Sequence, residues 1–165
     1  MHISSVTAPV AGQTAAISTV GIAPVTSVLI LDASEAGRGR LRALCERSRL
    51  APAVAEAATL SDFVIALDQV AFDVVFIDID SGLDVGMAAL SRLTRHPDQA
   101  GAVPIMIAAR DRPDLVLSAM RAGCPDCLFK DELSVEALQL AVSDATERRR
   151  DLEALAAARI LQTHL

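Results

Sequence analysis

The sequence predicts an α/β fold in which one parallel sheet of five strands is covered by helices on both faces. Short apolar runs alternate with longer amphipathic stretches from residue 28 onwards. The runs are continuously apolar, as in strands that are buried on both faces of a sheet. The chain has 165 residues, 52% of them hydrophobic, so one domain can bury a sizeable core. Right-handed crossovers leave few topologies, and we expect the doubly wound, flavodoxin-like strand order 2-1-3-4-5.

The individual elements follow from these runs and from local start and stop signals. Apolar runs predict five strands, at residues 28–31, 53–55, 74–77, 104–108 and 127–129. The intervening stretches predict helices over residues 35–49, 59–70, 84–96 and 111–122, and a last helix from Ser134. Thr59 or Ser61 is an N-cap signal, Pro97 helps to end the third helix, and Gly123 is a C-cap signal.

The two ends of the chain differ in composition from the centre. Residues 1–26 are rich in small residues and Pro and carry no charge beyond His2, which predicts a flexible extension or, alternatively, a segment docked on a neighbour. Residues 27–146 form the predicted domain. The stretch after Ser134 has no Pro or Gly, so residues 147–165 should extend the last helix. Its apolar spacing breaks heptad register at three arginines, which predicts an imperfect coiled coil in a homodimer or a fraying tail.

Composition excludes several classes of function. The net charge is −6, and the chain has no Trp or Tyr, which argues against a nucleic-acid partner. Three cysteines are too few for a disulfide framework and favour a reducing, cytoplasmic location. No apolar stretch approaches transmembrane length and no signal-peptide pattern is present, so we expect no membrane partner.

Three charged residues follow predicted strands and should meet at one edge of the sheet. Asp32 and Asp78 end the first and third strands, and Lys130, the single lysine beside fourteen arginines, ends the fifth. The carboxyl ends of these strands lie at the switch point where open α/β sheets bind ligands. The alternative is that both aspartates cap the following loops and that the lysine is an accident of composition.

Cys124 and Cys127 form a C-x-x-C motif that is typical of zinc sites and redox pairs. The motif leads into a strand rather than opening a helix, and no further ligands stand at matching spacing. We therefore favour a structural role for both thiols.

The segments Val28–Asp32, Phe72–Asp78 and Ala122–Lys130 resemble the receiver domain of bacterial two-component response regulators, over roughly residues 27–145. The resemblance implies that Asp78 accepts a phosphoryl group from a histidine kinase and that Lys130 contacts the phosphoryl oxygens. It also implies that Asp32 and Asp78 hold Mg²⁺. Such a domain is no enzyme beyond phosphoryl transfer to its own aspartate, which forms an acyl phosphate.

Three positions depart from this family pattern. Ala33 replaces the second acid after strand one, which leaves a weak Mg²⁺ site of Asp32 and Asp78, with Glu35 as a further candidate ligand. Ala108 replaces a Ser or Thr, and Cys127 replaces an aromatic residue. We therefore predict an atypical receiver that acts in signal transduction mainly as a protein-interaction and dimerisation module, with impaired phosphorylation switching.

Two alternative functions stay open. The first is a working phosphoacceptor, modified on Asp78 by a histidine kinase and controlling an output domain or another signalling protein. The second is a nucleotide-binding domain, although no glycine-rich phosphate loop follows the first strand.

Overall fold

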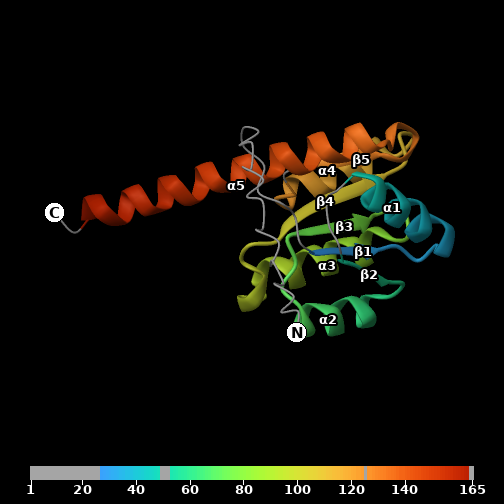
Figure 1. Cartoon of the computed structure of the whole chain (residues 1–165), viewed down its shortest axis with the longest axis horizontal. Helices are drawn as coiled ribbons and strands as arrows, with labels where there is room; N and C mark the ends of the chain where they lie inside the picture. Colours follow the sequence, from blue (N-terminus) through green and yellow to red (C-terminus); the bar gives the residue numbers. More distant parts are fainter. Residues whose placement is uncertain (1–26, 49–52, 125, 164–165) are drawn as a thin grey trace, which may run out of the picture.

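The computed structural model describes residues 27–48, 53–124 and 126–163, which contain one five-stranded parallel sheet of order β2-β1-β3-β4-β5 (Figure 1). The strands are β1 Ser27–Leu31, β2 Ala53–Ala57, β3 Val74–Asp78, β4 Val103–Ala108 and β5 Cys127–Phe129. The helices are α1 Glu35–Ser48, α2 Leu60–Gln69, α3 Leu83–Arg95, α4 Pro113–Arg121 and α5 Val135–Thr163. Two short 3-10 helices that the sequence did not predict are η1 Pro97–Gln99 and η2 Lys130–Glu132. The predicted fold class and strand order are confirmed.

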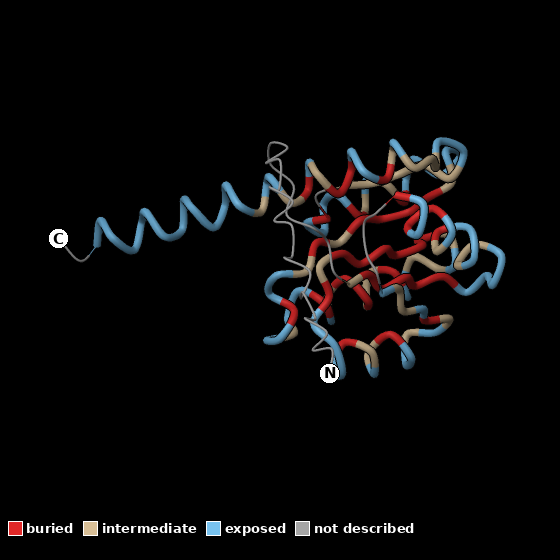
Figure 2. The backbone as a smooth tube through the Cα atoms, in the orientation of Figure 1, coloured by how far each residue is buried: buried red, intermediate tan, exposed pale blue. Residues whose placement is uncertain are grey.

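Each face of the sheet carries its own apolar core, because successive strand residues point to opposite faces. Val28 and Ile30 of β1 point to the face that is covered by α1 and α5, while Leu29 and Leu31 point to the face covered by α2, α3 and α4. All four side chains are at most 3% exposed. Burial on both faces explains why the central strands read as continuous apolar runs (Figure 2).

The helix ends follow the local signals. Thr59 is the N-cap of α2, and its Oγ1 accepts a hydrogen bond from the Asp62 amide at 3.1 Å. Gly123 follows α4 with a φ of +95°, a left-handed conformation that favours glycine at this position. Pro97 lies two residues after the end of α3 and is the first residue of η1.

Helix α5 changes character along its length. Its first part packs on the sheet through Leu138, Ala141, Val142 and Ala145, whereas every described residue from Arg150 onwards is exposed (Figure 2). Arg148 forms an ion pair with Asp126 at 3.1 Å, close to where the helix leaves the domain. Among the described residues, none of the helices combines the length and apolar character needed to cross a membrane. The predicted N-terminal extension, residues 1–26, lies outside the described residues.

Candidate functional site

The structure brings Asp32, Asp78 and Lys130 to the carboxyl edge of the sheet. Asp32 follows β1, Asp78 is the last residue of β3, and Lys130 opens η2 directly after β5. Parallel pairing in register places these strand ends side by side. Asp32 and Asp78 are each 3% exposed, and the proximity of Asp32 is one of the causes that raise the pKa of the Asp78 carboxyl. The Lys130 Nζ atom lies 2.9 Å from Asp78 Oδ2.

A fourth charged residue, Asp80, completes the site and was not predicted from the sequence. Its Oδ2 atom lies 3.1 Å from Lys130 Nζ and accepts a hydrogen bond from the Ala109 amide at 2.8 Å. Its own amide donates to Asp78 Oδ1 at 2.8 Å. Among the described residues, Lys130 thus pairs with Asp78 and Asp80. Asp32 and Lys130 both line a small cavity next to these pairs. The signal available in the sequence was a second aspartate two positions after Asp78.

Burial dominates the electrostatics of the site. Burial raises the pKa of the Asp78 carboxyl above its ordinary value, the Lys130 ammonium opposes this shift, and the neighbouring Asp32 adds to it. Burial alone would lower the pKa of the Lys130 ammonium. The hydrogen bonds to Asp78 and Asp80 outweigh that effect, so the pKa of Lys130 is raised and the lysine stays charged.

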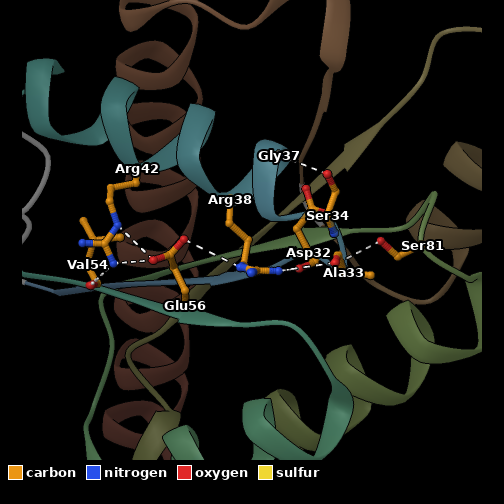
Figure 3. A network of polar contacts seen from close by, with 9 residues as sticks. All are labelled: Asp32, Ala33, Ser34, Gly37, Arg38, Arg42, Val54, Glu56 and Ser81. Atoms are coloured by element: carbon orange, nitrogen blue, oxygen red, sulfur yellow. Dashed lines mark hydrogen bonds and ion pairs between the residues drawn. The ribbon is translucent and has the colours of Figure 1, made fainter.

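Helix α1 and the end of β1 hold Asp32 in place (Figure 3). The Ser34 amide donates a hydrogen bond to Asp32 Oδ1 at 2.8 Å. The Arg38 guanidinium donates to the Asp32 carbonyl oxygen at 2.9 Å, and it also pairs with Glu56 at 3.7 Å. Arg42 binds the same Glu56 carboxylate through its Nε atom at 3.0 Å. This chain of contacts fixes the backbone from which the Asp32 side chain enters the site.

Gly37 allows the first turn of α1 to approach Asp32 closely. A Cβ atom at this position would lie 2.1 Å from Asp32 Oδ2 and 2.9 Å from its Cγ. Both distances are far below van der Waals contact, so any side chain here would displace the carboxylate or the helix. By contrast, a Cβ atom on Gly39, two residues further, would meet no atom within 4 Å.

The three departures from the receiver pattern surround the same site. Ala33 is exposed, and its amide donates to the Ser81 hydroxyl at 3.3 Å. Ala108 is fully buried at the end of β4, and Cys127 is half-buried in β5. Neither Ala108 nor Cys127 supplies a hydroxyl group or an aromatic ring at these positions.

The loop after β4 is held instead by Arg110. Its guanidinium lies 4.7 Å from the centre of the Phe129 ring and forms ion pairs with Asp131, at 2.9 Å, and Glu132. These contacts connect the loop that carries the Ala109 amide to η2, which carries Lys130. No pattern in the sequence predicted this connection.

The residues present suit a weakly held Mg²⁺. Asp32 and Asp78 provide two adjacent buried carboxylates, and Mg²⁺ commonly binds one or two carboxylates while keeping several waters. A cavity of about 100 Å³ beside Asp32 and Lys130 has room for such waters. Within the described ranges no three His, Cys, Asp or Glu side chains are placed to share an ion. Glu35 therefore does not complete a three-carboxylate site.

The cysteines are free thiols in the described parts of the chain. Burial raises the pKa of the Cys124 thiol, and it raises that of Cys127 to about 11. Burial likewise raises the pKa of Cys45 to about 12. Thiols with raised pKa values are poor nucleophiles and metal ligands at neutral pH. A structural role for Cys124 and Cys127 stays a prediction.

Comparison with known proteins places this geometry in a family. The model of the response regulator receiver domain matches residues 28–143, and the chain therefore belongs to this family of two-component signalling domains. No curated protein sequence matches the chain.

Solved receiver structures share the fold at low sequence identity. The signal receiver domain of an HD domain-containing protein from Pseudomonas fluorescens Pf-5 is 19% identical, with a TM-score of 0.63 over 77% of this chain and 98% of that one. A response regulator from Burkholderia pseudomallei, with a phosphorylated aspartic acid, calcium ion and citrate, is 22% identical, with a TM-score of 0.62 over 79% and 74%. NtrX from Brucella abortus is 20% identical, with a TM-score of 0.67 over 81% of this chain and 29% of that protein.

The close approach at Gly37 gives a paired prediction. Gly37→Ala should destabilise the fold by about 1–3 kcal/mol, because the new methyl group overlaps the Asp32 carboxylate. Gly39→Ala should stabilise it by about 0.5–1 kcal/mol, since alanine is the better helix former and the site is open. Urea denaturation of both variants measures the difference. Equal effects of the two substitutions would contradict the tight contact.

The raised pKa of Asp78 gives a prediction about pH. The folded state holds the Asp78 proton more tightly than the unfolded chain, so ionised Asp78 costs stability at neutral pH. Asp78→Asn should therefore stabilise the fold at pH 7, and the gain should shrink as the pH falls through the folded-state pKa towards the ordinary value of 3.8. Denaturation curves between pH 7.5 and 4.5 provide the measurement. The exposed Asp111→Asn should change stability by less than about 0.5 kcal/mol at every pH.

Proposed function

We propose that this receiver domain acts mainly as a protein-interaction and dimerisation module in cytoplasmic signal transduction, with impaired switching by phosphorylation. The proposal rests on the side chains that are present at the site and on the pairing of Lys130. Lys130 is already paired with two carboxylates, and the alanine side chain at position 108 cannot donate a hydrogen bond to a phosphoryl oxygen. A site with this composition can receive a phosphoryl group but has few groups that respond to it.

Asp78 is the candidate phosphoacceptor. In the transfer, a carboxylate oxygen of Asp78 forms a bond to phosphorus while the bond between phosphorus and the donor atom breaks, and the donor leaves with that electron pair. The donor atom is the imidazole nitrogen of a phosphohistidine or the bridging oxygen of acetyl phosphate. Asp78 Oδ1 accepts a hydrogen bond from the Asp80 amide and Oδ2 is paired with Lys130, so the nucleophile is oriented but also engaged. Burial raises the pKa of this carboxyl, and the Lys130 ammonium opposes the shift.

Asp32 and Asp78 are the residues that would hold Mg²⁺. When bound, the ion would neutralise negative charge on the transferred group. Because Ala33 supplies no carboxylate, we expect weak binding, and the pairing of Lys130 with Asp78 competes with an ion for the Asp78 carboxylate.

The C-terminal part of α5 supports the dimerisation half of the proposal. Leu152, Leu155 and Ile160 are between 58% and 67% exposed on a helix that extends past the domain. An isolated helix of this length is marginal in water, and apolar residues on its surface favour pairing with a second copy. The second copy would shield these side chains from solvent.

A working phosphoacceptor is the second candidate, favoured by the 2.9 Å contact between Lys130 Nζ and Asp78 Oδ2. Under this alternative a histidine kinase modifies Asp78, and the domain controls an output domain or another signalling protein. The two candidates differ in the extent and lifetime of phosphorylation.

A small-molecule phosphodonor separates the two candidates. Incubation of the full chain with acetyl phosphate and Mg²⁺ should give substoichiometric or short-lived modification of Asp78, because the site lacks the hydroxyl donor and one metal-binding acid. Intact-mass spectrometry measures the extent, with Asp78→Asn as the unmodified control. Stable, complete modification would refute the impaired-switch proposal and establish the second candidate.

The dimer has its own test. The full chain should sediment as a dimer at micromolar concentration. Leu155→Asp should raise the dissociation constant of that dimer at least about tenfold, since a buried unpaired charge in an apolar interface is costly. Leu140→Asp is the matched control in the same helix, because Leu140 is 63% exposed where α5 still packs on the domain. Dissociation by Leu140→Asp but not by Leu155→Asp would place the contact on the domain and contradict the proposed interface.

A further inference from the structure

The Asp80 carboxylate is held by two donors from different elements. Its Oδ2 atom accepts from the Ala109 amide at 2.8 Å and lies 3.1 Å from Lys130 Nζ. The amide comes from the loop after β4, and the ammonium comes from the turn after β5. An amide and an ammonium aimed at one oxygen form an anion-binding position.

This position adjoins the Asp78 side chain. The same Lys130 ammonium contacts Asp78 Oδ2 at 2.9 Å, so its two anionic partners lie on either side of one nitrogen atom. A phosphoryl group attached to Asp78 would carry its oxygens into the range of this ammonium. The donors that such an oxygen needs are the donors that Asp80 now uses.

We propose that Lys130 and the Ala109 amide form an oxyanion-binding position that the Asp80 carboxylate occupies as an internal ligand, which a phosphoryl oxygen would have to displace. The inference deepens the proposed function and rests on it for the location of the phosphoryl group. Asp80 thereby keeps the site charged and paired when no external anion is bound.

Tethering makes this internal ligand an effective competitor. Asp80 is two residues from Asp78, and its own amide is hydrogen-bonded to Asp78 Oδ1. Attachment through so short a segment gives the carboxylate a local concentration on the order of millimolar or higher. An external oxyanion must exceed that concentration or offer more contacts.

The Asp80 side chain is largely enclosed and is held inside by the two donors to its Oδ2 atom. Its side chain is 19% exposed. The second carboxylate oxygen, Oδ1, is buried and has no hydrogen-bond partner in the described structure. An unsatisfied carboxylate oxygen costs free energy, so the contacts of Oδ2 must offset that cost for the side chain to stay inside. Arg110 steadies both donors by linking the loop of Ala109 to η2.

An anion titration tests the proposal without any phosphorylation. In an Asp78→Asn background, which cannot be phosphorylated there, Asp80→Ala should lower the apparent Kd for orthophosphate at least about tenfold. The readout is the Ala109 amide signal in ¹H–¹⁵N spectra of the full chain at constant ionic strength. Asp111→Ala in the same background removes an equal charge from an exposed turn and should leave the Kd unchanged. An unchanged Kd with Asp80→Ala, or an equal gain with Asp111→Ala, would overturn the proposal.

Two further variants keep the outcome interpretable. Asp80→Asn retains the size of the side chain but not its charge, and it should give an intermediate Kd; it replaces Asp80→Ala if that variant fails to fold. With Asp78 restored, Asp80→Ala should raise the rate of modification by acetyl phosphate at least about tenfold. Tighter phosphate binding, with no modification of Asp78 by acetyl phosphate in either the parent chain or the Asp80→Ala variant, would uphold the role of Asp80 and refute Asp78 as a phosphoacceptor.

Discussion

The ammonium group of Lys130, shared between Asp78 and Asp80, is the interaction on which the arrangement of the site depends. Three carboxylates, those of Asp32, Asp78 and Asp80, lie at the carboxyl edge of the sheet, and the ammonium pairs with the last two. Buried charges are tolerated when they are paired and hydrogen-bonded. Without the ammonium, the negative charges of Asp78, at the end of β3, and Asp80, in the following turn, would repel each other with no positive charge between them. A compact ammonium can satisfy both at once, a task for which the planar fork of arginine is poorly shaped.

The site and the helical extension lie at opposite ends of the domain. The carboxyl ends of the strands hold the charged residues, while Arg148, Arg149 and Leu152 of α5 border Ala102 and Pro104, beside the start of β4. Any influence of the site on a partner bound to the extension must therefore cross the length of the sheet. Helix α5 itself spans that distance, because it begins a few residues after Lys130 and packs along one face (Figure 1).

The sequence predicted those features that depend on which residues are buried. It did not predict contacts that depend on the direction in which a side chain points. The strands β1, β3 and β4 followed from continuous apolar runs, since strands buried on both faces leave little freedom of composition. The five helices followed from the stretches between the runs and from their start and stop signals. The meeting of Asp32, Asp78 and Lys130 followed from topology alone. Asp80 was missed because its role depends on which way one short side chain turns and on the position of the Ala109 amide, 29 residues away. The contact of Arg110 with Phe129 escaped for the same reason.

The continuity of α5 has a mechanical consequence. A helix rises 1.5 Å per residue, so the exposed part from Arg150 to Thr163 adds a rod of about 20 Å to the domain. The base of this rod rests on the sheet through small residues, Ala141 and Ala145, which bring it close to β4. A tilt of about 10° at that base would carry the far end through about 3–4 Å. Because α5 is continuous, a small change in its orientation against the sheet would displace its far end much more than its base.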